Sequence, residues 1–128
     1  MKKILALLIL FFTIFNLSAC SSKQTYELKA SFNNKLVEQA EIIPKSDSLD
    51  IEIPLAGISC NVDSFKTLLE RKQDTFIVTL VGDETEERCS RNFTATISPI
   101  SIGEYWLKVI YEKNGENTEL LSERFVIK

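Results

Sequence analysis

Residues 105–127 read YWLKVIYEKNGENTELLSERFVI. Apolar side chains occupy every second position from Tyr105 to Tyr111, and a second alternating set follows the Asn114-Gly115 pair. Alternation with a period of two is typical of a strand that buries one of its faces. Asn-Gly favours a type I′ hairpin turn, because both central residues of that turn take positive φ. The sequence therefore predicts two long antiparallel strands joined by a tight turn.

Further segments alternate in the same way, at residues 26–32, 49–55, 76–81 and 93–97. Ile77 and Val81 make the second face of 76–81 apolar as well, as a central strand requires. Pro54 lacks an amide donor, so the strand at 49–55 is expected to end there or to lie at a sheet edge. Residues 36–43 fit a strand or an irregular edge segment, and residues 64–72 fit a short helical turn or a strand.

Six or seven short strands separated by turn signals predict an all-β fold, an antiparallel two-sheet sandwich. Residues 103–109, GEYWLKV, combine Gly-x-Tyr with alternating apolar positions and resemble the penultimate strand of immunoglobulin-like and fibronectin-like domains. The order Cys60, apolar strand, Cys89 in a polar loop, Phe93 strand and Gly-x-Tyr resembles small exported bacterial immunoglobulin-like domains over residues 58–127. This resemblance implies an immunoglobulin-like sandwich of about seven strands in residues 25–128, with a disulfide from the start of one strand to a loop.

The N-terminus has the organisation of a targeting signal. Two lysines precede an apolar run, residues 4–15, that is shorter than the roughly 20 residues of a membrane-spanning helix, so residues 1–19 are interpreted as a signal peptide. Leu17-Ser18-Ala19-Cys20 resembles the lipobox of bacterial lipoproteins. That resemblance implies cleavage before Cys20 and attachment of diacylglycerol and a further acyl chain such as palmitate. The alternative is an ordinary secretory signal that is cut elsewhere.

Residues 20–24 are expected to form a short polar tether between the lipid and the domain. Ser21 follows the cysteine, and in Gram-negative lipoproteins a residue other than Asp at that position implies the outer membrane. The expected location is therefore the cell envelope, lipid-anchored in the outer membrane and facing the periplasm or the cell surface.

The size and charge of the mature chain exclude some classes of function. Cleavage after residue 19 leaves 109 of the 128 residues, one ordinary domain, and takes Lys plus Arg from 15 to 13 against 18 acids, a net charge near −5. Such an acidic domain is a poor candidate for binding nucleic acid.

Cys60 and Cys89 remain as an even pair in an exported chain, so they are expected to form a disulfide. A redox or zinc pair is disfavoured, because the two are not in a Cys-x-x-Cys arrangement and the chain has no histidine.

The same composition argues against an enzyme. A chain without histidine lacks the commonest group for proton transfer near neutral pH, and no motif for an activated nucleophile or a phosphate loop is present. The densest acids, Asp83, Glu84, Glu86 and Glu87, are interpreted as an exposed loop in preference to a carboxylate-only hydrolase or a calcium site. We expect no catalytic residue, metal, cofactor or small-molecule substrate.

Trp106 and Ile110 are the candidate partner-binding residues. If Tyr105 and Leu107 face the core, alternation places these two side chains on the opposite face. An outward tryptophan is a frequent binding anchor, although a loop or the N-terminal segment of the same chain could cover it. The leading hypothesis is a lipid-anchored, non-enzymatic module that binds an envelope or host protein. A pilotin-like assembly factor and an inhibitor of an envelope or host enzyme are the alternatives.

Overall fold

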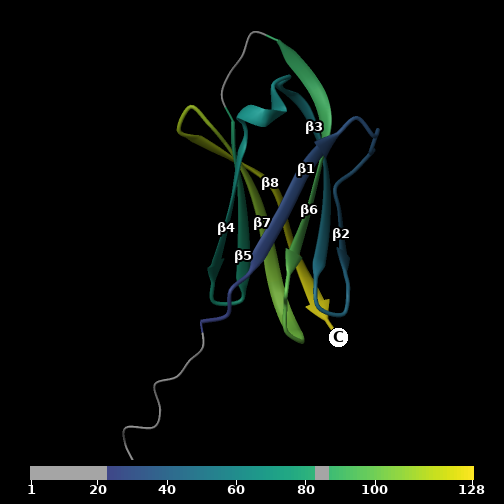
Figure 1. Ribbon diagram of the computed structural model, residues 1–128, viewed down its shortest axis with the longest axis vertical. Coiled ribbons are helices and arrows are strands. Elements are labelled where there is room, and N and C mark those ends of the chain that lie inside the picture. Colours follow the sequence, from purple (N-terminus) through teal and green to yellow (C-terminus); the bar gives the residue numbers. More distant parts are fainter. Residues whose placement is uncertain (1–22, 83–86) are drawn as a thin grey trace, which may run out of the picture.

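The structure is a computed structural model, and it describes residues 23–82 and 87–128 as a two-layer β-sandwich (Figure 1). In these ranges the chain forms eight strands and one 3₁₀ turn: β1 (Glu27–Asn33), β2 (Glu41–Pro44), β3 (Leu49–Ser59), η1 (Val62–Ser64), β4 (Lys66–Lys72), β5 (Thr75–Gly82), β6 (Arg88–Ser98), β7 (Gly103–Lys113) and β8 (Glu116–Ile127). The predicted all-β class is confirmed, with one more strand than expected. Between residue 23 and the C-terminus, leaving out 83–86, no helix is long and apolar enough to span a bilayer.

The strands form two four-stranded sheets with the orders β1-β6-β3-β2 and β4-β5-β7-β8. The predicted antiparallel arrangement is wrong for one neighbouring pair, because β5 and β7 are parallel. The reason is topological. After β5 the chain crosses to the other sheet, runs back along the single strand β6, and returns to start β7 at the end where β5 started. One intervening antiparallel strand restores the original direction. Alternation of side chains carries no information about strand direction, so the sequence could not predict this pair.

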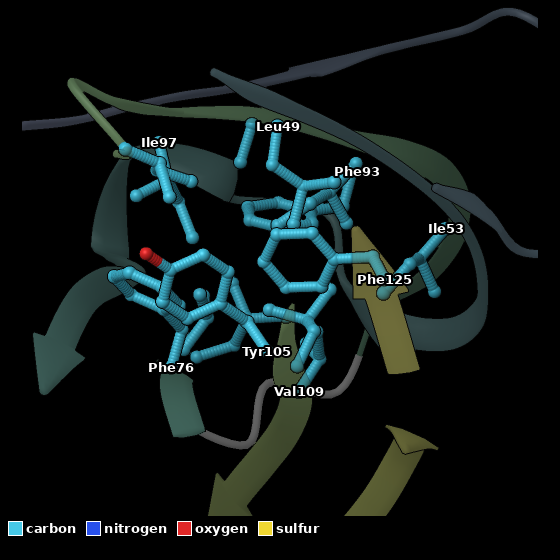
Figure 2. Close-up of a cluster of buried hydrophobic side chains, with 14 of the residues drawn as sticks. Leu49, Ile53, Phe76, Phe93, Ile97, Tyr105, Val109 and Phe125 are labelled. Atoms are coloured by element: carbon cyan, nitrogen blue, oxygen red, sulfur yellow. The ribbon is translucent and has the colours of Figure 1, made fainter. Parts of the chain in front are cut away.

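The core lies between the inner faces of the sheets (Figure 2). Phe76 contacts Tyr105 with a ring separation of 5.5 Å, and Tyr105 stacks on Phe125 at the same separation. The members with almost no exposed surface come from both sheets: Leu49, Ile51, Phe76, Val78, Leu80, Phe93, Ile97, Leu107, Val109 and Ile127. The inner faces predicted for residues 49–55, 76–80, 93–97 and 105–109 are therefore confirmed. In β1, by contrast, Ala30 is exposed, because this strand is the edge of its sheet.

Pro54 lies inside β3, which continues to Ser59, so the strand does not end at the proline. The alternative prediction describes its position better: pairing with β2 stops at Glu52, and beyond that point β3 is paired with β6 alone. A residue without an amide donor is tolerated where one side of the strand has no partner. Of residues 36–43, only the last three belong to a strand, the four-residue β2.

Of residues 64–72, for which a helical turn was one of two predictions, Lys66–Lys72 form strand β4, while Ser64 is the last residue of the short turn η1. β4 pairs with β5 as an edge strand, and its partly exposed residues give a weak alternation. The hairpin predicted at Asn114-Gly115 is confirmed: both residues have positive φ, 52° and 78°, and Lys113 pairs with Glu116.

The predicted disulfide is also confirmed, with Cα atoms of Cys60 and Cys89 5.0 Å apart. Its placement differs from the prediction, because Cys89 belongs to strand β6 and not to a loop. Cys60 directly follows β3, and Ile58 of β3 pairs with Cys89. The bond therefore joins two neighbouring strands of one sheet at the end opposite residues 23–26 (Figure 1).

Candidate binding surface

Trp106 and Ile110 lie on the outward side of β7, as predicted. Trp106 is 47% exposed, and Ile110 is half-buried. In register, Trp106 lies between Thr75 of β5 and Arg124 of β8. Within residues 23–82 and 87–128, no segment buries the indole ring, so the alternative in which the chain itself covers Trp106 is not observed there.

Three further apolar residues extend this surface across the sheet. Ile77 of β5 pairs with Lys108, so Trp106 and Ile110 are its two diagonal neighbours on β7. Diagonal neighbours in a sheet are close enough for long side chains to contact. Leu68 of β4 is in register with Thr79 and is therefore a diagonal neighbour of both Ile77 and Val81 of β5. Leu68 is 55% exposed. We call the surface formed by Leu68, Ile77, Val81, Trp106 and Ile110 the Trp106 face.

The sequence contained a signal for part of this surface. Ile77 and Val81 made both sides of β5 apolar, but that pattern was explained by a central position in the sheet. The parallel pairing of β5 with β7 places Ile77 beside Trp106, and nothing in the sequence indicated that pairing. Leu68 was missed because residues 64–72 also fitted a helical turn.

Charged residues of both signs surround the Trp106 face. Lys72 Nζ lies 3.4 Å from Glu70 Oε1 on the β4 side, and Arg124 forms an ion pair with Glu104 on the β8 side. Lys108 stands among the apolar residues, in register with Ile77. Three of these side chains are basic and two are acidic, so neither sign dominates the surface. Desolvation of the aromatic and aliphatic side chains is therefore the main source of affinity that this surface offers.

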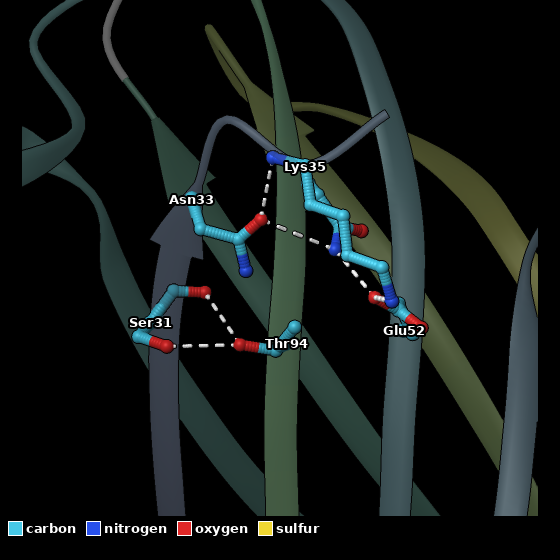
Figure 3. Close-up of polar contacts among 6 residues, drawn as sticks. Ser31, Asn33, Lys35, Glu52 and Thr94 are labelled. Carbon is cyan, nitrogen blue, oxygen red and sulfur yellow. Dashed lines mark hydrogen bonds and ion pairs between the residues drawn. The ribbon is translucent and has the colours of Figure 1, made fainter. Parts of the chain in front are cut away.

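The outer face of the other sheet is dominated by polar side chains (Figure 3), with Ile43 of the edge strand β2 as its exposed large apolar residue. Ser31 Oγ and Thr94 Oγ1 are 2.8 Å apart, and Asn92 Nδ2 donates a hydrogen bond to Glu52 Oε1 at 2.7 Å. Lys35 Nζ donates to the same carboxylate oxygen at 3.1 Å. We call this surface the polar face and define it by Ser31, Asp50, Glu52, Asn92, Thr94 and Thr96. A shallow hollow of about 420 Å³ lies over most of these residues.

Both carboxylates of the polar face are stabilised in their charged form. The hydrogen bond from Lys35, followed by that from Asn92, holds the pKa of Glu52 below its ordinary value. The hydrogen bond from Lys45, followed by that from Thr96, lowers the pKa of Asp50 in the same way. The side chains of this face therefore satisfy one another, with one exception: the buried Asn92 Oδ1 has no hydrogen-bond partner among the described residues.

The remaining predicted sites fall partly outside the described residues. Cys20, the predicted lipid attachment site, lies outside them, as do Asp83, Glu84 and Glu86 of the acidic segment. Glu87 is exposed, and its carbonyl accepts a hydrogen bond from the Cys60 amide. In the part of the chain that the structure describes, no three His, Cys, Asp or Glu side chains are grouped closely enough to hold a metal ion.

Comparison with known proteins finds no family model, no curated protein and no solved structure that matches this chain. The two outer faces are therefore the surfaces from which a function can be inferred. On the Trp106 face, the apolar side chains lie among charged ones, since Glu70 and Lys108 are both in register with Ile77. Protein interfaces often contain such an exposed aromatic residue, which is desolvated on binding. The polar face has few unsatisfied groups to offer a partner.

Proposed function

We propose that this chain is a lipid-anchored, non-enzymatic lipoprotein of the cell envelope that binds a protein partner through the Trp106 face. One observation carries the proposal: three strands contribute apolar side chains around Ile77, and the described residues leave Trp106 and Leu68 about half exposed. An exposed apolar patch with a polar rim is typical of an interaction surface. Covering it with a partner removes apolar area from water at no cost in broken internal hydrogen bonds.

The proposed anchor is supported by the sequence of the first 20 residues. A charged head, an apolar core, small residues and Cys20 occur in the order that resembles a lipoprotein signal. Two or three acyl chains on one residue would hold the protein stably, because each buried methylene contributes about 0.8 kcal/mol. Ser21 supports an outer-membrane location, facing the periplasm or the cell surface.

We also propose that the domain is related to immunoglobulin-like sandwiches. Tyr105 lies in the penultimate strand, and its hydroxyl donates a hydrogen bond to the Ser101 carbonyl oxygen at 2.9 Å. A tyrosine that bonds back to the chain just before this strand is typical of such domains. The parallel β5–β7 pair departs from their all-antiparallel pattern, so the relation concerns the architecture and not the strand order.

The binding proposal is tested by affinity purification of the full-length protein from detergent-solubilised envelope of the native host. We expect Trp106→Ala to weaken capture of the partner by roughly 30-fold, the loss of about 2 kcal/mol that is typical of a central aromatic anchor. Leu36→Ala is the matched control, because Leu36 is 94% exposed but lies outside the Trp106 face. Equal capture by both variants would contradict the proposed role of Trp106.

The anchor has its own test. Cys20→Ala should move the protein from the membrane fraction to the soluble fraction, and the mass of the wild-type N-terminal peptide should show the added acyl chains. A wild-type protein with an unmodified Cys20 would refute the anchor without affecting the binding test.

A further inference from the structure

The end of the sandwich where residues 23–26 join the domain carries a second exposed apolar feature. Ile102, in the connection between β6 and β7, is 79% exposed. The same end holds the turns that join β2 to β3 and β4 to β5, as well as the C-terminus (Figure 1). Ile102 is separate from the Trp106 face, because four residues of an extended strand place it about 13 Å from Trp106.

The connection that carries Ile102 is fixed on the domain by several contacts. Ile100 is buried, and its amide donates to the Asp47 carbonyl oxygen at 2.7 Å. The Tyr105 hydroxyl donates to the carbonyl oxygen of Ser101. Ile102 is thus the exposed residue of a segment whose neighbours are held in place, so its exposure is a stable feature of this end.

The N-terminal side of the domain is fixed to the same connection. Gln24 Nε2 donates hydrogen bonds to the Pro99 carbonyl oxygen and to Ser101 Oγ, both at 3.3 Å. Tyr26 donates to Gln24 Oε1 at 3.0 Å, and its ring packs edge-on against Phe76 at 5.1 Å. From residue 24 onward, therefore, the chain is held against the domain by these contacts.

The length of chain between Cys20 and Gln24 limits how far this end can lie from the lipid. Four residues span at most about 14 Å at full extension. The polar layer on one side of a bilayer is about 5–8 Å thick. An eleven-residue strand such as β7 is about 36 Å long, so the opposite end of the sandwich lies much farther from Cys20.

We propose that this end of the sandwich is a membrane-contact surface, with the Ile102 side chain in the interfacial layer of the phospholipid bilayer that holds Cys20. The inference rests on the proposed lipid anchor. Lys23 and Lys128 lie at the same end. Lys45 and Lys72 also lie there but are ion-paired with Asp50 and Glu70, and the acids Glu27, Asp47, Asp74 and Glu104 share this end. Lysines near a bilayer surface are attracted to anionic headgroups. The contact orients the domain upright, so that the Trp106 face stays accessible from the aqueous side.

Fluorescence of a single tryptophan tests this orientation. Trp106 is the chain's one tryptophan, so the Trp106→Phe protein has no tryptophan fluorescence. Ile102→Trp and the matched control Leu36→Trp are each introduced into that background. Leu36 is 94% exposed in the connection after β1, at the end opposite Gln24. The full-length proteins are produced in a lipoprotein-processing bacterial host and reconstituted into vesicles of phosphatidylethanolamine and phosphatidylglycerol, with or without brominated acyl chains.

We expect brominated lipids to remove most of the emission of the Ile102→Trp variant and almost none from the Leu36→Trp variant. Wild-type Trp106, which lies about 13 Å from position 102, should be quenched less than the tryptophan of the Ile102→Trp variant. The bias of tryptophan toward interfaces is common to both variants, so only position distinguishes them.

Two results would overturn the membrane contact while leaving the anchor intact. With acylation of Cys20 verified by mass, equal quenching of the two variants would exclude a preferred orientation. Blue-shifted emission of the Ile102→Trp variant that brominated lipids do not quench would show that protein, for example a second copy, covers position 102. An unacylated Cys20 would instead refute the anchor, and with it this inference.

Discussion

The two outer faces of the sandwich differ although the inner faces of both sheets are built alike. On the polar face, serine, threonine, asparagine and carboxylate side chains bind one another, as between Asn92 and Glu52. On the Trp106 face, Ile77 has Leu68, Ile110 and the half-exposed indole ring as diagonal neighbours, with charged residues in register between them. A self-satisfied polar surface loses hydrogen bonds with water and gains little when it is covered, whereas an apolar surface gains by being covered. Under the proposed function, the sheet with the polar face contributes stability and the sheet with the Trp106 face binds the partner.

The largest effect is expected from the disulfide, which only the sheet with the polar face contains among the described residues. Replacing Cys60 and Cys89 together by alanine should lower the free energy of unfolding by about 3–4 kcal/mol, because the bond closes a loop of 29 residues in the unfolded chain. Urea denaturation of the purified protein measures the change. Reduction of the wild-type protein should reproduce it, and an unchanged midpoint in both experiments would contradict the stabilising role.

Asn92→Asp sharpens the comparison within the polar face. The substitution keeps the side-chain shape but replaces the buried donor that binds the half-buried Glu52 with a buried carboxylate, so the free energy of unfolding should fall by about 3 kcal/mol at neutral pH. Acidification should restore part of the loss, because protonation of either carboxyl group supplies a donor again. Asn117→Asp, at an exposed position of β8, is the control and should change stability little. Equal effects of both substitutions on the free energy of unfolding would contradict a stabilising role for the hydrogen bond between Asn92 and Glu52.

The pH dependence of stability should also come from the polar face. Glu52 and Asp50 have pKa values lowered by folding, so their contribution is complete above the ordinary values of 4.5 and 3.8 and is lost as the pH falls through the lowered values. Glu52→Gln should therefore flatten the decline in unfolding free energy measured by urea denaturation between about pH 6 and about pH 3. Glu70→Gln, on the exposed edge strand β4, is the control for removal of a surface carboxylate. A Glu52→Gln curve that parallels the wild type would contradict this assignment.

The smallest effect on stability is expected on the Trp106 face. Because Trp106 is about half exposed, Trp106→Ala should change the free energy of unfolding by less than about 1 kcal/mol, although it weakens binding strongly. Thermal unfolding followed by circular dichroism measures the stability. A large loss of stability would mean that the ring is part of the fold, and the distinction between the two faces would fail.

The sequence predicted most of what depends on local pattern. The Asn114-Gly115 hairpin, the inner faces around Phe76 and Phe93, and the Cys60–Cys89 bond follow from turn chemistry, alternation and cysteine count. The hairpin and the inner faces depend only on residues close together in the sequence. The disulfide could be predicted because Cys60 and Cys89 were the two cysteines left after Cys20 was assigned to the lipid.

Features that depend on which strands become neighbours were not predictable. The outward position of Trp106 followed from alternation, but its position beside Ile77 depends on the parallel pairing of β5 with β7. Leu68 belongs to an edge strand whose exposure weakens its alternation. The bond between Asn92 and Glu52 joins residues 40 positions apart and required the register of β3 with β6.

Site-specific photo-crosslinking in living cells of the native host tests the difference between the two faces most directly. A benzophenone side chain is placed at Ile110 on the Trp106 face or at Thr96 on the polar face, both half-buried positions within long strands. The account predicts a discrete adduct with a protein from position 110, which Trp106→Ala removes, and no adduct from position 96. An adduct from position 96 alone, or equal adducts from both positions, would contradict it.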